Sequence, residues 1–128
     1  MQALLDTHAL LWWLDGDERL SPSARAFIGD SDNRILVSAA SAWEIATKVR
    51  LGRLPGDIEV AARFLECLLE QGFTPLGISV EHALRAGSLP GPHRDPFDRM
   101  LIAQAQAESI PLISNESLFY GYGVQRLW

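Results

Sequence analysis

The sequence predicts an α/β fold in which a mainly parallel central sheet lies between layers of helices. Short apolar segments typical of buried strands alternate along the chain with longer segments whose apolar residues recur at helical spacing. Strands that alternate with helices pair in parallel through crossover connections, which places helices on both faces of the sheet. Proline and glycine occur singly between these segments. These observations together predict a three-layer sandwich.

In the first half of the chain, apolar runs at residues 2–5 and 34–37 predict two strands. Side-chain caps and glycine stops delimit the helices, because Ser or Asp accepts from a free backbone N–H and glycine tolerates a left-handed turn. On these signals helices cover residues 8–14 and 22–29, the segment from Ser38 to Gly52, and the segment from Asp57 to Gly72. The apolar faces of the last two are Ala42, Ile45, Ala46 and Val49, and Val60, Ala61, Phe64, Leu65, Leu68 and Leu69.

In the second half, Asp95 followed by Pro96 has the cap-then-proline order of a helix start, which predicts a helix to about Glu108. The other expected elements are strands at residues 73–78, 111–114 and 124–127, a short helix at 79–86, a loop at 89–94 and a helical turn at 117–120. We expect one domain over residues 1–128, because a chain of this length buries enough surface for a single core.

The composition disfavours several classes of protein. Eleven Lys and Arg against sixteen Asp and Glu give a net charge of −5, which argues against binding nucleic acid through a broad basic face. The single cysteine, Cys67, forms no intramolecular disulfide and no zinc cluster, so we expect a reducing compartment, the cytoplasm. No apolar run reaches the roughly 18 residues that span a bilayer, so we expect no membrane segment and no targeting segment.

Four acidic residues are candidates for a site. Asp6 directly follows the first predicted strand and Glu116 lies just past the strand at 111–114, so parallel pairing places both at the carboxyl edge of the sheet, where ligands bind in such folds. Asp98 shares a helical face with the apolar residues three, four and seven positions on, and an inward-facing carboxylate needs a partner. Glu44 lies on the helix after the second strand.

Each acid also has a purely structural interpretation. Asp98 lies at the third helical position after Asp95, where an acid complements the helix dipole. Asp6 is placed to cap the helix that follows it, and Asp95, directly before a proline, is better explained as a helix cap than as a site residue. Glu44 lies off the predicted apolar face and precedes Lys48 by four residues, the order that favours a solvated ion pair. Glu116 is equally compatible with an exposed turn.

Convergence of these acids would create a cation site. Three or four carboxylates in one cleft repel one another and need protons or a bound cation, and oxygen ligands favour Mg²⁺ or Mn²⁺ over zinc. The histidines show no metal-ligand spacing and are better explained as core or surface residues: His8, His82 and His93. Trp12, Trp13 and Trp43 fall within or beside helical apolar faces and are interpreted as core or interface residues.

Four segments of the chain share their order with those of a known family: LLDTHALLWWL, SAASAWEIATKVRLGRL, HRDPFDRMLIAQA and LISNESLFYGYGV. Together they resemble the PIN-domain family over nearly the whole chain. The likeness is greatest to small VapC-type toxins of bacterial toxin–antitoxin pairs, on the combination of the DTH start, the WEIA helix and the HRDPFDR segment. The resemblance implies a metal-dependent ribonuclease with a parallel sheet and a cluster of acids.

The carboxylates that the resemblance assigns to catalysis and to Mg²⁺ or Mn²⁺ are Asp6, Glu44, Asp98 and Glu116. It gives Asp95 a supporting role in this subgroup. Glu116 departs from the family pattern, in which an aspartate usually stands two residues after a Thr or Ser, here Ser114. Because glutamate is one methylene longer than aspartate, it alters the metal position or its occupancy at that corner, and Asn115 is an alternative contributor.

The leading hypothesis is an endoribonuclease that uses Mg²⁺ or Mn²⁺ to hydrolyse RNA phosphodiester bonds. Lys48, Arg94 and Arg99 are candidate phosphate contacts. An alternative is a degenerate PIN domain that binds RNA or protein without catalysis, with Glu116 as the sign of a lost site. A receiver-like phosphoacceptor domain is disfavoured, because no aspartate follows the second strand.

The resemblance also implies protein partners. A cognate antitoxin is expected to insert a segment near the acids and block them, and the toxin is expected to form a homodimer. Exposed apolar residues among Trp12, Trp13 and Leu51 would suit the antitoxin groove or the dimer face.

Overall fold

The computed structural model describes residues 1–128, apart from the side chains of Leu118 and Tyr120. The described strands form a five-stranded sheet in the order β3-β2-β1-β4-β5, and every neighbouring pair is parallel. The strands are β1 (Gln2–Leu5), β2 (Arg34–Ser38), β3 (Thr74–Leu76), β4 (Leu112–Ile113) and β5 (Arg126–Leu127). The predicted parallel α/β sheet is confirmed.

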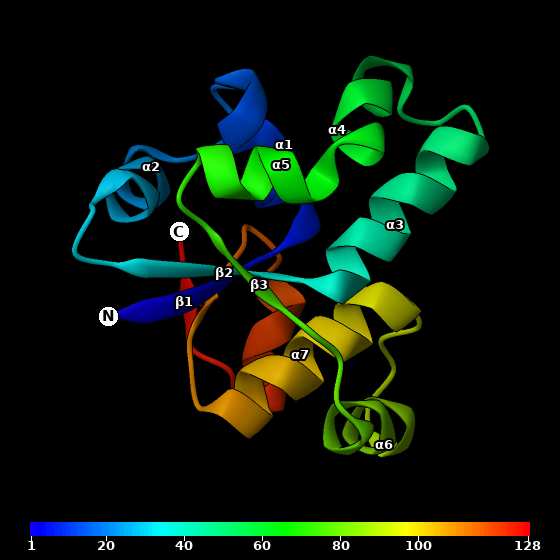
Figure 1. The fold of residues 1–128 in the computed structure, drawn as a ribbon. Coiled ribbons are helices and arrows are strands. Elements are labelled where there is room, and N and C mark those ends of the chain that lie inside the picture. Colours follow the sequence, from blue (N-terminus) through cyan, green and yellow to red (C-terminus); the bar gives the residue numbers. More distant parts are fainter.

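Helices cover both faces of the sheet. The α-helices are α1 (Thr7–Asp15), α2 (Pro22–Gly29), α3 (Ala39–Arg50), α4 (Ile58–Ala62), α5 (Phe64–Glu70), α6 (Val80–Ser88) and α7 (Pro96–Glu108). Two short 3-10 helices are η1 (Pro55–Asp57) and η2 (Ser117–Tyr122). Figure 1 shows α1 and α2 on one side of the central strands and α7 on the other. The predicted three-layer arrangement is therefore confirmed.

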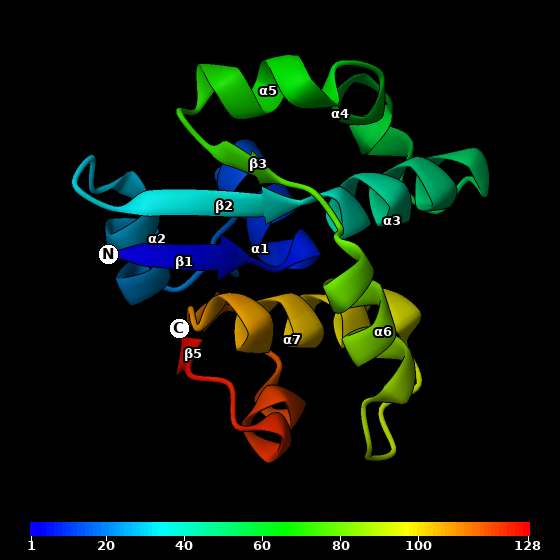
Figure 2. The same cartoon turned by 60° about the horizontal axis from the view of Figure 1, so that its bottom comes forward.

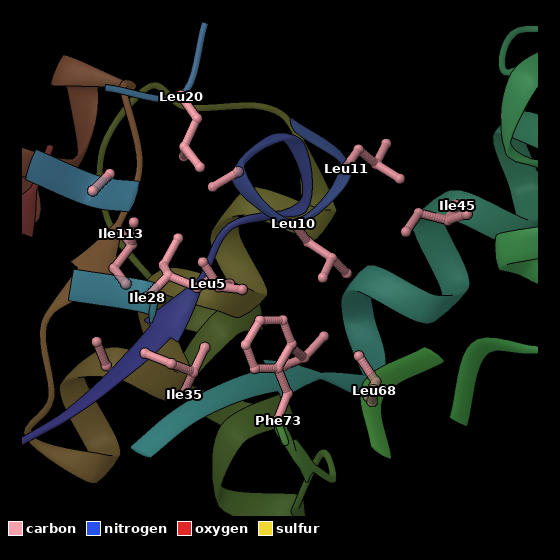
Figure 3. Packing of buried hydrophobic residues seen from close by; sticks show 14 residues of the cluster. Leu5, Leu10, Leu11, Leu20, Ile28, Ile35, Ile45, Leu68, Phe73 and Ile113 are labelled. Atoms are coloured by element: carbon pink, nitrogen blue, oxygen red, sulfur yellow. The ribbon is translucent and has the colours of Figure 1, made fainter. Parts of the chain in front are cut away.

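Each face of the sheet has its own apolar core, because alternate residues of a strand point to opposite faces. Leu5 and Val37 belong to one cluster, which is formed with α1, α2, Ile45 of α3 and α5. Leu4 and Leu36, their neighbours in the same strands, belong to the second cluster, which is formed largely with α7. Figure 3 shows the first cluster around Leu5.

The segment between α3 and β3 forms different helices from those predicted. A single helix was expected from Asp57 to Gly72, but Arg63 adopts φ −125° and ψ 38°, which ends α4 before α5 begins. This break interrupts the helical periodicity on which the predicted apolar face depended. Of that face only Leu68 is buried, whereas Leu65 and Leu69 are exposed.

The carboxyl ends of β1 and β2 lead directly into α1 and α3, as Figure 2 shows. Asp6 and Ser38 act as the caps at these two junctions: the Asp6 side chain accepts from the N–H of Ala9, and the Ser38 side chain accepts from that of Ala40. The first turns of both helices therefore begin at one edge of the sheet. No helix of the described chain is long and apolar enough to cross a membrane.

Candidate active site

Asp6 lies at the carboxyl end of β1 and is almost completely buried. Its Oδ1 accepts from the backbone N–H of Ala9 at 2.9 Å, so the cap interpretation is correct. Its Oδ2 accepts from the hydroxyl of Ser114 at 2.6 Å, across 108 positions of sequence. Ser114 directly follows β4, so this hydrogen bond joins the ends of two adjacent strands.

Glu44 is buried on α3, with 3% of its surface exposed. Its Oε2 accepts from Nζ of Lys48 at 2.6 Å, so the predicted ion pair forms, although it is not the solvated pair expected. The other oxygen, Oε1, is buried without a hydrogen-bond partner in the described structure. A buried carboxylate oxygen without a donor is costly, which marks it as a position where a ligand would be stabilised.

The predicted apolar face of α3 was placed one position away from the observed one. The buried residues of α3 are Ala40, Ser41, Glu44 and Ile45, whereas Ala46 is exposed. Ser41 hydrogen bonds to Thr7 of α1 at 2.9 Å, which ties the two helices together near the acids.

Asp98 lies in the first turn of α7 and is half-buried. The apolar residues on its face, Leu101, Ile102 and Ala105, are buried as predicted. Its Oδ2 lies 2.9 Å from Nε2 of His93, in the loop before α7. Sequence reasoning missed this contact, since a histidine five residues from an aspartate across a helix start gives no metal-ligand or helical spacing.

Asp95 is the N-cap of α7, as predicted. Its Oδ1 accepts from the backbone N–H groups of Phe97 at 2.9 Å and Asp98 at 3.1 Å. Arg99 is one of the predicted phosphate contacts. Its guanidinium instead donates hydrogen bonds to the backbone carbonyls of His93 and Leu89. It therefore supports the loop in this structure.

The remaining predicted residues are Glu116, Asn115, Arg94 and Lys48. The backbone N–H of Glu116 donates to the Ser114 hydroxyl at 3.0 Å, which holds the turn after β4, and the residue is half-buried. Asn115 and Arg94 are exposed. Lys48, the third candidate phosphate contact, is paired with Glu44.

Asp6, Glu44 and Asp98 interact electrostatically. Burial is the main cause that raises the pKa of Asp98 to about 6, and the negative charges of Asp95, Asp6 and Glu44 act in the same direction. The hydrogen bond from His93 opposes the increase. Burial likewise raises the pKa of Asp6; hydrogen bonds oppose it and the Glu44 charge adds to it. The fold therefore brings Asp6, which follows β1, close enough to Glu44 of α3 and Asp98 of α7 for their charges to interact.

The donor chemistry of this region matches a hard divalent cation, because it offers carboxylate oxygens and an unbonded Glu44 Oε1. In the described structure, however, no three or more His, Cys, Asp or Glu side chains form a group that could hold a metal ion. The acids repel one another across a shared region without forming a ready coordination cage. A cation would relieve that repulsion.

Comparison with known proteins decides the family. The model of the family described as PIN domain matches residues 3–124, nearly the whole chain. The chain belongs to the PIN-domain family. The resemblance drawn from the four sequence segments is thereby confirmed, and the PIN domain includes all four candidate acids.

Relatives with curated names are ribonucleases. This PIN domain is 32% identical to ribonuclease VapC22 of Mycobacterium tuberculosis over 117 residues, which cover 88% of this chain and 85% of the relative. It is 48% identical to ribonuclease VapC16 of the same organism over 59 residues, 46% of this chain but only 40% of that protein.

Solved structures share the fold of this PIN domain. VapBC2 from Rickettsia felis, solved bound to a DNA fragment from its promoter, includes a chain that matches with a TM-score of 0.72. The match covers 100% of both chains at 16% sequence identity. At that identity the likeness demonstrates the fold, which agrees with the parallel sheet and its two helical layers.

Proposed function

We propose that this PIN domain is an endoribonuclease and the toxin of a toxin–antitoxin pair. The observation that carries the proposal is the convergence of Asp6, Glu44 and Asp98, from three separate elements, into one region where their charges interact. The similarity to ribonuclease VapC22, which extends over most of both chains, supports RNA as the substrate. A cytoplasmic location fits a chain with no membrane-spanning helix in its described part.

The proposed cofactor is Mg²⁺ or Mn²⁺. Asp6, Glu44 and Asp98 would hold it, and Glu116, at the end of the neighbouring strand, would complete the acidic set. When bound, such a cation lowers the pKa of a water molecule and stabilises the negative charge that develops on the phosphate. The unbonded Oε1 of Glu44 supports this assignment, because it is a buried acceptor that lacks a donor.

The chain's own residues prepare the site for this chemistry. Ser114 and the N–H of Ala9 hold the Asp6 carboxylate in one orientation. Lys48 compensates part of the negative charge on Glu44. Arg94 is exposed beside α7 and has no hydrogen-bond or ion-pair partner among the described residues, so it is the proposed phosphate contact.

The deciding experiment is cleavage of a pool of structured cellular RNAs by the purified chain, with Mg²⁺ or Mn²⁺, with EDTA, and with Asp98→Asn. Cleavage that requires the metal and disappears in the variant supports the proposal. Absence of cleavage by folded protein without antitoxin contradicts it. Metal-independent RNA binding would then favour the degenerate domain, with Glu116 in place of the usual aspartate as its cause.

Exposed apolar residues are the proposed contacts for an antitoxin partner. Leu51, Leu65 and Leu69 are exposed on or beside α3 and α5, and are candidate contacts for an antitoxin segment. Trp12 and Trp13 are half-buried and pack against the core, so they contribute less than expected to a free surface. Light scattering of the chain with and without a coexpressed antitoxin tests both the complex and the homodimer.

A second apolar region is the proposed homodimer face. Trp43 of α3 is 62% exposed, and Val80 and Leu84 of α6 are exposed as well. A hollow of about 260 Å³ lies among residues of α3, α6 and α7, including Trp43 and Phe97. Trp43→Ser is expected to shift a dimer toward monomer if this face is the interface.

A further inference from the structure

His93 is the direct hydrogen-bond partner of a candidate catalytic carboxylate. Nε2 of His93 lies 2.9 Å from Oδ2 of Asp98. An ionised carboxylate only accepts hydrogen bonds, so the imidazole donates from Nε2. No donor among the described residues bonds to Oδ1 of Asp98. The histidine therefore occupies one oxygen of the carboxylate and leaves the other available.

The backbone of His93 is held on both sides. Its N–H donates to Oη of Tyr122 at 3.2 Å, and its carbonyl accepts from Nη1 of Arg99 at 2.9 Å. The imidazole also packs edge-on against Phe119, with ring centroids 6.3 Å apart. Contacts from α7 and from η2 thus fix the position of this side chain from two directions.

The path of the loop before His93 depends on a glycine. Gly91 has φ +98°, a conformation that other residues rarely adopt. A Cβ at this position would lie 2.6 Å from Oη of Tyr122, the atom that accepts from the His93 N–H. Glycine therefore permits the close approach of the Tyr122 hydroxyl, which accepts the hydrogen bond from the His93 N–H.

We propose that His93 is a positioning residue for the reaction at this site: its Nε2–H holds the Asp98 carboxylate in one orientation and leaves Oδ1 as the oxygen available to a divalent cation. The inference rests on the proposed function. Partners that hold a metal-ligating carboxylate through its second oxygen fix its direction, and their loss typically lowers metal affinity or activity by about 10- to 100-fold.

The test compares His93→Leu, which removes the donor, with His93→Gln, which keeps an N–H donor at the end of a side chain. Mn²⁺ affinity is measured by calorimetry on the chain without RNA, together with kcat and KM on an RNA that the wild type cleaves. We expect Mn²⁺ binding to weaken about 10- to 100-fold in His93→Leu and to recover to within a few-fold of wild type in His93→Gln. The thermal midpoints of His93→Leu and His93→Gln should agree with each other.

A second measurement observes the His93 ring directly, in the wild type and in Asp98→Ala. In ¹⁵N-labelled, metal-free protein at neutral pH, the His93 ring should carry its proton on Nε2, and the Nε2–H signal should lose protection from exchange in Asp98→Ala. A ring protonated on Nδ1 alone would contradict the contact and overturn the inference without any folding question.

Two outcomes of the variant test overturn the positioning role. Wild-type Mn²⁺ affinity and kcat in His93→Leu would show that the hydrogen bond is dispensable. Equal losses in both variants, with lowered thermal midpoints, would assign His93 a merely structural role. A wild-type chain that neither binds Mn²⁺ nor cleaves RNA is a different failure, because it contradicts the proposed function and removes the inference with it.

Discussion

The hydroxyl of Ser114 donates to Oδ2 of Asp6 at 2.6 Å and connects the carboxyl ends of β4 and β1. Both residues are buried, and the same hydroxyl accepts from the backbone N–H of Glu116. One side chain therefore orients a candidate catalytic acid and holds the turn that carries another.

Ser114→Ala is expected to lower the free energy of unfolding by about 1–3 kcal/mol, because the buried Asp6 carboxylate loses a donor and keeps its desolvation cost. Urea denaturation at pH 7 measures the change. Ser23→Ala is the matched control, since Ser23 is exposed on α2, and it should change stability by less than about 0.5 kcal/mol. A Ser114 variant as stable as this control would contradict the assigned role of the hydrogen bond.

Asp98→Asn is expected to stabilise the metal-free protein at pH 8. The pKa of Asp98 rises from an ordinary 3.8 to about 6 in the folded chain, so the native state holds its proton more tightly than the unfolded state. The associated stability is present below about pH 4 and is lost as the pH rises through 6. The gain in the variant should approach about 1–3 kcal/mol at pH 8 and vanish near pH 4.

Denaturation of wild type and Asp98→Asn in EDTA across this pH range tests the prediction. A gain that is constant with pH would show that the substitution acts through packing and not through charge. Added Mn²⁺ should raise the thermal midpoint of the wild type more than that of the variant, because the variant lacks a ligand charge.

Lys48→Met is expected to destabilise the chain by about 2–4 kcal/mol, because it leaves the buried Glu44 carboxylate without its ion-pair partner. Glu44→Gln in the same chain should restore part of the loss, since a neutral amide is less costly to bury. A double-mutant cycle by urea denaturation gives the coupling between the two residues. A coupling close to zero would mean that the 2.6 Å contact contributes nothing measurable.

Gly91→Ala is expected to destabilise the chain by about 1–3 kcal/mol, because φ is +98° and the new Cβ would meet the Tyr122 hydroxyl. The control is Gly87→Ala in α6, where a Cβ meets open space. That substitution should stabilise by about 0.5–1 kcal/mol through the unfolded chain. Thermal denaturation of both variants under one condition checks the opposite signs.

The sequence by itself determined the alternation of strands and helices, and with it the parallel sheet and its layers. These features follow from local signals, namely short apolar runs and capping residues such as Ser21, Ser38 and Asp95. Local signals failed at two places. The break at Arg63 divides a segment whose spacing predicts one helix, and α3 buries Glu44, which lies off the predicted apolar face. The prediction of one domain stays a prediction.

Only the tertiary structure decided which partners the candidate acids have and which of their charges interact. The residue patterns placed Asp6 at a strand end, Asp98 at a helix start and Glu44 on a helix, and only the resemblance implied that the acids cluster; the folded chain brings the three close enough for their charges to interact. The contact of Asp98 with His93 depends on a loop held by Tyr122, from a segment nearly thirty residues away. Spacing along the chain encodes secondary structure, whereas convergence depends on the packing of both faces of the sheet, which only the folded chain specifies.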